Sequence, residues 1–277
     1  MRRTLRKLFR RRIVLLAAVI LLLVAAITVL AAWISRFDPN DTAVLDRLHA
    51  PDLSHWLGTD ELGRDVFSRI AFGGQYSLSI AALTTLGAIV AGTALGLIAG
   101  FFRRLDAPLM RVVDAMMSLP DILLAISLVA ILGPSILNVV LALVLVYTPR
   151  VARVVRASTL VLRELLFVEA ARALGVSTPR ILLHHILPNL ASPILVQASF
   201  IFAYAILAEA ALSFLGVGVP PEIPTWGTMV AGSQQYAHQS LGVVLYPGLA
   251  IILTALSLQL LGDGVRDLLD PRLKKSS

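Results

Sequence analysis

Three carboxylates lie inside or beside long apolar stretches of the sequence, where a charged group is costly and usually has a function. Asp114 and Asp121 are seven residues apart, a spacing that can place both on one side of a helix. Intramembrane hydrolysis would need such a carboxylate pair, or a nucleophile with its base. The third, Glu209, follows a long apolar run. We interpret Glu209 as a residue of a solute pathway or gate, or as a hydrogen-bonded structural carboxylate, and the sequence leaves both open.

Other catalytic signatures are missing from the sequence. A P-loop needs a lysine directly after a glycine, and neither Lys7, Lys274 nor Lys275 follows one. No His-Glu-x-x-His pattern occurs, and the adjacent His184 and His185 point to different faces of a helix. The lack of cysteine excludes thiol chemistry and disulfides. We therefore predict no catalytic residue and no metal site, and we expect any nucleotide chemistry to belong to another chain.

The composition indicates an integral membrane protein. Hydrophobic residues make up 57% of the chain, charged residues only 15%, and the mean hydropathy is +0.84, whereas soluble domains are roughly a quarter charged. A membrane helix needs about 20 apolar residues, and uncharged runs cover 13–34, 76–102, 122–149, 190–208 and 242–262. Gly133 and Pro134 divide the third run, and we expect the helix before them to begin near Leu109. These runs predict an all-α protein with six transmembrane helices.

The first run is longer than the apolar core of a cleavable signal peptide, which is roughly 7–15 residues, so we expect it to remain as an anchor. Basic residues test the orientation through the positive-inside rule. With both termini in the cytoplasm, only four of the 24 lysines and arginines fall outside: Arg36, Arg47, Arg64 and Arg69. The sequence thus predicts cytoplasmic termini and extracytoplasmic loops at 35–75 and 216–241. The scattered charges without an aromatic reading surface argue against nucleic-acid binding.

One face of the second span consists of small residues. They recur at intervals of four: Ala88, Gly92, Gly96 and Gly100. Because small residues let helix backbones approach closely in lipid, this face is predicted to pack against another helix.

A polar helical segment at 157–189 interrupts the apolar pattern. Residues 164–174 are good helix formers, and Gly175 suits a left-handed helix end. Thr178 and Pro179 suit the cap and first position of a second helix, which we expect Pro188 to end. Small and polar side chains could receive a partner here: Glu169, Ala170, Ala171, Arg172 and Ala173. We interpret the segment as a docking element, and a helix lying on the membrane surface is the alternative.

Five motifs occur in an order typical of one family. They are HWLGTDELGRDVFSR at 55–69, VEAARALG at 168–175 followed by LPN at 187–189, ALSFLG at 211–216, PTWG at 224–227 and GDGVRDLLDPR at 262–272. With these motifs the chain resembles the permease subunits of bacterial ABC importers for dipeptides, oligopeptides and nickel, specifically the subunit with a large loop after its first helix. One departure is His184, where the family commonly has arginine.

This resemblance implies the type I ABC importer permease fold in a bacterial plasma membrane. The expected segments are a basic cytoplasmic amino-terminus at 1–12, the first transmembrane helix at 13–34 and an extracytoplasmic loop at 35–75. A five-helix core at 76–265, which includes the cytoplasmic coupling loop 157–189, and a cytoplasmic tail at 266–277 would follow. The implied partners are a homologous second permease, one or two ATPase subunits that hold ATP and magnesium, and an extracytoplasmic substrate-binding protein.

The resemblance also implies roles for particular residues. Coupling to the ATPase would fall to Glu169, Ala170, Ala171, Arg172 and Gly175. Contacts to the binding protein would come from Gly58, Thr59, Asp60, Gly63, Arg64 and Asp65. The expected substrate is a dipeptide or oligopeptide, with nickel or a metal chelate as the alternative, and an intramembrane hydrolase or a passive channel as more distant ones.

Overall fold

The computed structural model describes residues 12–269, and its regular structure is helical. Within this range no β-strand forms, and an isolated antiparallel bridge joins Thr59 to Asp65. Some residues used in the topology prediction lie outside the described residues: the basic residues at 2–11, Arg272, Lys274 and Lys275. The same holds for parts of the expected segments 1–12 and 266–277.

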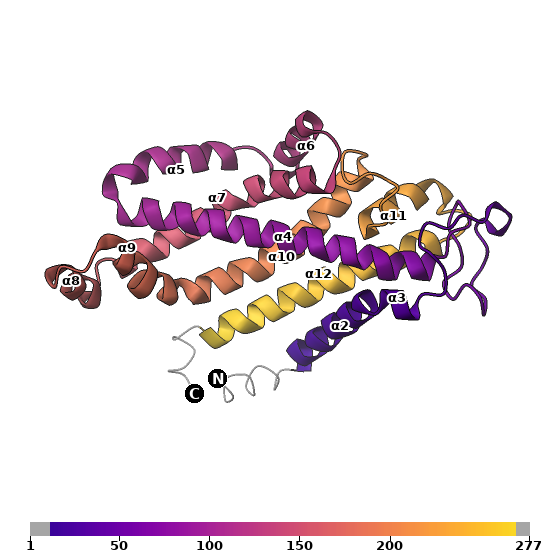
Figure 1. Cartoon of the computed structure of the whole chain (residues 1–277), viewed down its shortest axis with the longest axis horizontal. Helices are drawn as coiled ribbons and strands as arrows, with labels where there is room; N and C mark the ends of the chain where they lie inside the picture. The colour runs from indigo at the N-terminus through magenta and orange to yellow at the C-terminus, as the bar shows by residue number, and fades with distance from the viewer. Residues whose placement is uncertain (1–11, 270–277) are drawn as a thin grey trace.

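Four long helices pack along the long axis of the molecule (Figure 1): α4 (Val66–Phe101), α7 (Ile136–Leu162), α10 (Ala191–Phe214) and α12 (Gly242–Leu269). The first helix, α2 (Arg12–Val29), packs against α12 and α4 and is followed by the short α3 (Ala31–Ile34). We call the end that carries residues 35–65 the loop end. The opposite end, which carries α8 (Leu166–Ala173), is the α8 end. Helix α2 begins and α12 ends on the side of the molecule nearer α8 (Figure 1).

Five helical stretches are long and apolar enough to cross a membrane: Arg12–Val29, Val66–Phe101, Ile136–Leu162, Thr178–Phe214 and Gly242–Asp267. A sixth arises if the bent pair α5 (Arg103–Met117) and α6 (Asp121–Leu132) is taken as one span. Large apolar side chains such as Leu22, Leu86 and Leu137 stay exposed on these helices, as expected for surfaces that face lipid or another chain. The chain is therefore an all-α, multi-pass membrane protein.

The prediction of one continuous helix from near Leu109 to Gly133 is wrong. The chain bends by 90° between α5 and α6, where Pro120 has an extended ψ of 131° and precedes the first residue of α6. Proline lacks the N–H that a continuing helix needs and disfavours helical geometry at the residue before it. The break at Gly133 is confirmed, since this glycine has a φ of +88°. Asp114 and Asp121 consequently lie on different helices.

The predicted small-residue face of α4 is confirmed as a contact face, and it packs against α7. Ala88, Gly92, Gly96 and Gly100 are all buried. A Cβ atom at Gly96 would lie 2.6 Å from the carbonyl oxygen of Ala152 on α7. The backbones of α4 and α7 thus approach more closely than larger side chains would permit.

At the loop end, α4 begins at Val66, so the last ten residues of the expected loop 35–75 are helical. The other short elements here are η1 (Val44–Asp46), α11 (Trp226–Ser233) and η4 (Gln234–Tyr236). The indole Nε1 of the buried Trp226 donates to the carbonyl oxygen of Ile70 at 3.0 Å, and its backbone N–H donates to Ser77 Oγ at 3.0 Å. Helix α11 is thereby fixed against α4.

The segment after α7 contains α8, α9 (Thr178–Arg180), a π-helical turn η2 (Ile181–Ile186) and a 3₁₀ turn η3 (Leu187–Leu190) that leads into α10. The expectation that Pro188 ends the second helix is wrong. The chain stays helical through Pro188 and changes only its hydrogen-bond pattern. Proline removes one backbone donor, and the amide Nδ2 of Asn189 donates to the His185 carbonyl oxygen at 2.7 Å. The side chain of Asn189 thus keeps a backbone acceptor paired within an irregular helix.

We expect Gly96→Val to destabilise the bundle, because its branched side chain would collide with the α7 backbone. Overpacking of this kind costs about 1–3 kcal/mol. The matched control is Ala94→Val, at an exposed position of the same helix. Thermal unfolding in detergent should give a lower Tm for Gly96→Val only, and equal Tm values for both variants would show that the contact does not limit stability.

Candidate functional site

Helix α8 projects from the α8 end, beyond the long helices (Figure 1). Val168 and Ala171 are its two buried residues and hold it to the rest of the chain. Leu166 and Leu174, at either end of α8, are 82% and 83% exposed, respectively. Both ends of α8 thus carry a large apolar side chain that the rest of the described chain leaves uncovered.

The five predicted coupling residues are divided between two faces of this segment. Glu169, Ala170, Arg172 and Gly175 are exposed. Ala171 is buried, so the expectation that it would meet a partner needs correction: it packs inward. The guanidinium of Arg172 lies 4.8 Å from the ring centre of Phe101, a cation–π contact with the end of α4.

Gly175 ends α8 as predicted, in a left-handed conformation with a φ of +74°. The N–H of Gly175 donates to the Arg172 carbonyl oxygen and that of Val176 donates to the Ala171 carbonyl oxygen, both at 3.0 Å. This pair of bonds is the Schellman motif. The following cap is Ser177, one residue earlier than the predicted Thr178, and its side chain forms no capping hydrogen bond.

Arginines of α7 pair with carboxylates of α5 and α6. Arg153 donates to Asp114 at 2.6 Å and Arg150 donates to Asp121 at 3.0 Å. The two aspartates considered for hydrolysis lie on different helices, and each is bound to its own arginine of α7. The structure does not bring them together as a pair. A further arginine–carboxylate pair lies just after the end of α7. There the hydrogen bond from Arg163 lowers the pKa of the Glu164 carboxyl below its usual value.

Glu209 is buried near the end of α10, with 1% of its surface exposed. Its Oε1 accepts hydrogen bonds from Ser213 Oγ at 2.9 Å and from Thr225 Oγ1 at 2.7 Å. A Cβ atom at Gly227 would lie 3.0 Å from Oε1, so glycine makes room for the carboxylate. The residue therefore ties α10 to the start of α11. Its role in a gate remains a prediction.

The six residues predicted to contact a binding protein build the loop itself. Gly58, Thr59, Asp60, Gly63 and Asp65 are buried, so the expectation that they form a contact surface needs correction. Asp65 caps α4 by accepting from the Ser68 N–H at 2.8 Å. A Cβ atom at Gly58 would lie 2.5 Å from the His49 carbonyl oxygen, so the turn requires glycine there. Sequence alone could not distinguish a motif that folds a loop from one that is presented to a partner.

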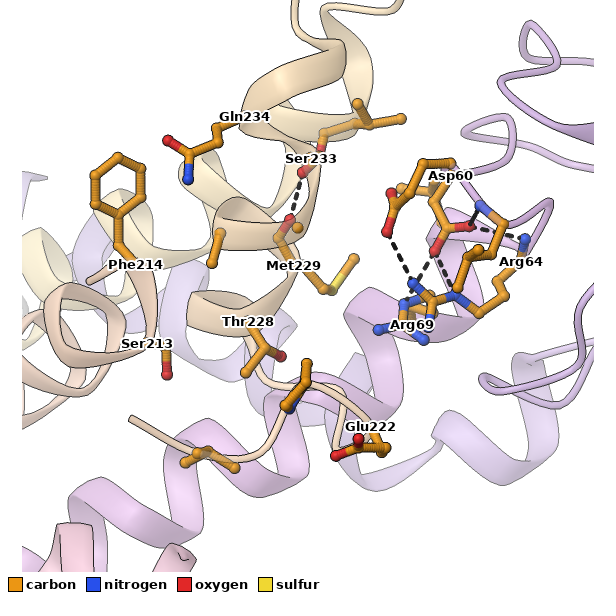
Figure 2. Close-up of a pocket in the computed structure, with 18 of the residues that line it drawn as sticks. Asp60, Arg64, Arg69, Ser213, Phe214, Glu222, Thr228, Met229, Ser233 and Gln234 are labelled. Carbon is orange, nitrogen blue, oxygen red and sulfur yellow. Dashed lines mark hydrogen bonds and ion pairs between the residues drawn. The ribbon is translucent and has the colours of Figure 1, made fainter. Parts of the chain in front are cut away.

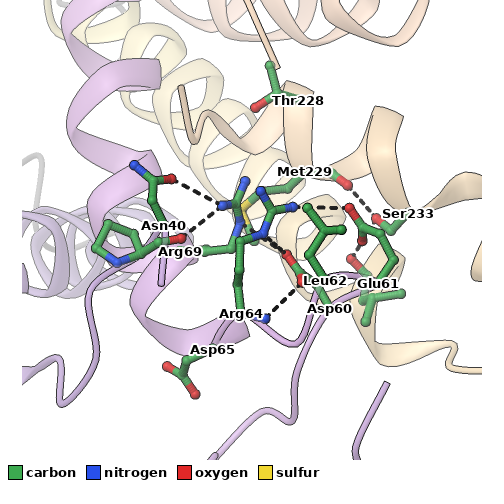
Figure 3. A network of polar contacts seen from close by, with 12 residues as sticks. Asn40, Asp60, Glu61, Leu62, Arg64, Asp65, Arg69, Thr228, Met229 and Ser233 are labelled. Atoms are coloured by element: carbon green, nitrogen blue, oxygen red, sulfur yellow. Dashed lines mark hydrogen bonds and ion pairs between the residues drawn. The ribbon is translucent and has the colours of Figure 1, made fainter. Parts of the chain in front are cut away.

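Asp60 is the centre of an ionic network at the loop end (Figure 3). Its Oδ2 accepts from Arg64 Nε at 2.6 Å and lies 3.4 Å from Arg69 Nε. Arg64 Nη2 also donates to Glu61 Oε1 at 3.1 Å. Arg69 is 2% exposed, and its Nη1 donates to the Pro39 carbonyl oxygen at 2.8 Å. Burial is tolerated here because the charges are paired and hydrogen-bonded.

This network forms one wall of a cavity of about 560 Å³ (Figure 2). The other walls come from the end of α10, the turn after it and α11. The sequence did not indicate a cavity here, because its walls come from segments about 150 residues apart.

Within residues 12–267, no group of three potential metal ligands occurs.

Two known family descriptions cover most of the chain. Residues 92–275 match the family described as binding-protein-dependent transport system inner membrane component. The chain belongs to this family. Residues 1–51 also match the N-terminal transmembrane domain of oligopeptide transport permease C.

Relatives of this permease cover nearly all of it. It is 49% identical over 98% of its length to a putative peptide transport system permease protein of Brucella suis, of which the match covers 92%. It is 44% identical over 90% of its length to the dipeptide transport system permease protein of Alkalihalophilus pseudofirmus, of which 82% is covered. A glutathione transport system permease protein of Pectobacterium atrosepticum is 41% identical over 97% of this chain and 90% of its own length.

Among solved structures, the permease resembles a chain of the MetNI methionine ABC transporter in an inward-facing conformation. The TM-score is 0.60 at 18% sequence identity, and the match covers 73% of this chain and 97% of that chain. At this identity the likeness concerns the fold, which is that of a type I ABC importer permease.

We expect Gly175→Val to loosen the end of α8, whereas Gly175→Asn should preserve it. No atom outside the neighbouring residues lies within 4 Å of a Cβ at Gly175, so the cost is in the backbone alone. A β-branched residue in left-handed geometry costs about 1–3 kcal/mol, and asparagine adopts it readily. Amide hydrogen exchange at Val176 should be about tenfold faster in the valine variant. Equal exchange in both variants would contradict this account of the helix end.

Proposed function

We propose that the chain forms half of the transmembrane pathway of an ATP-driven importer for dipeptides or oligopeptides, working by alternating access. The family supports a role in binding-protein-dependent transport. Several relatives are peptide or dipeptide transport permeases by name, which supports a peptide substrate. These names favour peptides over nickel, which the sequence motifs also allow.

The proposed assembly contains a homologous second permease and an extracytoplasmic substrate-binding protein. One or two ATPase subunits would hold ATP and magnesium, and this chain would have no ATPase site of its own. We place the α8 end and both termini in the cytoplasm. The distribution of basic residues supports this orientation, and so does the common side on which α2 begins and α12 ends (Figure 1).

The observation that carries the proposal is the position and exposure of α8. It lies beyond the ends of the long helices (Figure 1). With this end in the cytoplasm, an ATPase would have access to it. Exposed Leu166 and Leu174 flank the exposed Glu169 and Arg172, so apolar anchors surround polar groups. This combination suits a groove on a protein, and it favours ATPase docking over a helix lying on the membrane surface.

Movement of α8 would reach the pathway through its buried side. Val168 and Ala171 belong to the same apolar core as Ile181 and Ile186 of the π-helical turn. That turn leads through η3 directly into α10. We propose that ATP-driven displacement of α8 shifts α10 through these contacts, because packed side chains transmit displacement rather than absorb it.

The rival functions have less support. The hydrolase interpretation needs Asp114 and Asp121 close together, and each instead pairs with its own arginine. A passive channel would pass substrate without nucleotide, which gives α8 no role. Of the three functions, only the ATP-driven transporter requires an exposed helix that binds an ATPase.

We expect Ala170→Arg to abolish ATP-driven uptake, because a long charged side chain would prevent α8 from entering a fitted groove. The control is Ala107→Arg, an exposed alanine on α5. Both variants should reach the membrane in normal amounts. Affinity purification in mild detergent should recover a second permease and P-loop ATPases with the control, but not the ATPases with Ala170→Arg.

Full uptake and normal ATPase recovery in Ala170→Arg would refute docking through this face of α8. Recovery of the natural chain alone, stably folded and without any ATPase, would refute the importer itself. Substrate flux that continues after ATP is removed would instead favour a channel.

A further inference from the structure

The cavity at the loop end is large enough for a small solute. Its volume of about 560 Å³ lies within the range of about 300–1,000 Å³ that is usual for small-molecule sites. Figure 2 shows side chains from the loop, from α4, from the end of α10 and from α11 around one space. Small-molecule sites are usually concave and lined by apolar side chains with a few polar groups, and this lining is of that kind.

One wall of this cavity contains the guanidinium groups of Arg64 and Arg69, and each has N–H donors that its contacts within the protein do not use. Arg64 uses Nε and Nη2 for Asp60 and Glu61, and Arg69 uses Nε and Nη1 for Asp60 and the loop backbone. Among the described residues, Nη1 of Arg64 and Nη2 of Arg69 have no hydrogen-bond partner. A guanidinium carries five N–H donors and binds carboxylates strongly. This wall can therefore accept a carboxylate without losing its internal ion pairs.

The cavity also offers a negative group and an apolar surface. Glu222 is exposed at its edge, and within residues 12–267 its carboxylate forms no ion pair or hydrogen bond (Figure 2). Phe214, Val219 and Met229 supply apolar lining. A matching ligand carries a carboxylate for the arginines, an ammonium group for Glu222 and a small apolar side chain for the apolar lining.

We propose that this cavity holds a short peptide in its zwitterionic form. The peptide carboxylate binds Arg64 and Arg69, and the peptide ammonium binds Glu222. The assignment rests on the proposed function for the peptide class, while the choice of a free carboxylate and a free ammonium comes from the lining. The site lies at the loop end, opposite α8, and it would hold the solute before passage between the permeases.

Peptides with blocked ends provide the first test. The importer complex, purified in lipid nanodiscs without its binding protein, is titrated by calorimetry with alanyl-alanine, N-acetyl-alanyl-alanine and alanyl-alanine amide. Each blocked peptide should bind about tenfold more weakly, because a hydrogen bond to a charged group is lost. Equal affinity for all three peptides, or no binding of alanyl-alanine, would overturn the proposal.

Two variants locate the site. Gln234 lines the cavity and Gln235 does not, although both are exposed. Gln234→Trp should fill the cavity and reduce alanyl-alanine affinity at least tenfold, and Gln235→Trp should leave it unchanged. Glu222→Gln should remove the preference for alanyl-alanine over its N-acetyl form while the preference over the amide remains. Unchanged affinity in Gln234→Trp would place peptide binding elsewhere and overturn the proposal.

The outcomes separate this site from the proposed function. If the natural complex takes up peptides with ATP but Gln234→Trp binds alanyl-alanine normally, the cavity proposal fails and the importer stands. Gln234→Trp could instead weaken attachment of the binding protein and leave alanyl-alanine affinity unchanged. In that case the cavity receives a side chain of the binding protein, and the peptide site is refuted. If no peptide is taken up, the proposed function fails as well.

Discussion

The close packing of α4 against α7 is the contact on which the rest of the structure depends. Glycines on α4 let the two backbones meet, with Gly96 against the carbonyl oxygen of Ala152. Helix α4 begins directly after the ionic loop, and α7 ends four residues before α8. One tight helix pair thus connects the loop end to the α8 end. In lipid, where apolar burial does not drive helix association, such close packing is a main source of rigidity.

A second route between the ends runs through α10. The buried side of α8 packs in the same core as the π-helical turn that leads into α10. At the other end of α10, Glu209 accepts hydrogen bonds from Ser213 and Thr225, which fixes α11 beside it. Helix α11 forms a wall of the cavity. Packed contacts therefore run from α8 to the cavity. If α8 is displaced as we propose, α10 would carry the movement, and the α4–α7 pair would stay fixed beside it.

The features that could be predicted from the sequence were those with a local physical cause. The apolar runs, the small face of α4, and the ends at Gly133 and Gly175 each follow from hydropathy or backbone geometry. The bend at Pro120 was missed because a proline near a span predicts a break only weakly. Ala171 is buried in a core built by several helices, and the cavity is lined by segments far apart in the sequence. Asp60 is buried through ion pairs with Arg64 and Arg69, which the order of charges along the loop does not assign. Composition and spacing cannot reveal those contacts.

Crosslinking from α8 tests the proposed contact with the ATPase directly. The natural chain has no cysteine, so a single introduced cysteine supplies its only thiol. A single Ala170→Cys variant, expressed with its partners, is treated with a short reagent that joins a thiol to an amine. If α8 docks on the ATPase, this exposed position gives a covalent product with it, and the buried Ala171→Cys control gives none. Absence of the product at Ala170→Cys in an intact, active complex would contradict the coupling role of α8.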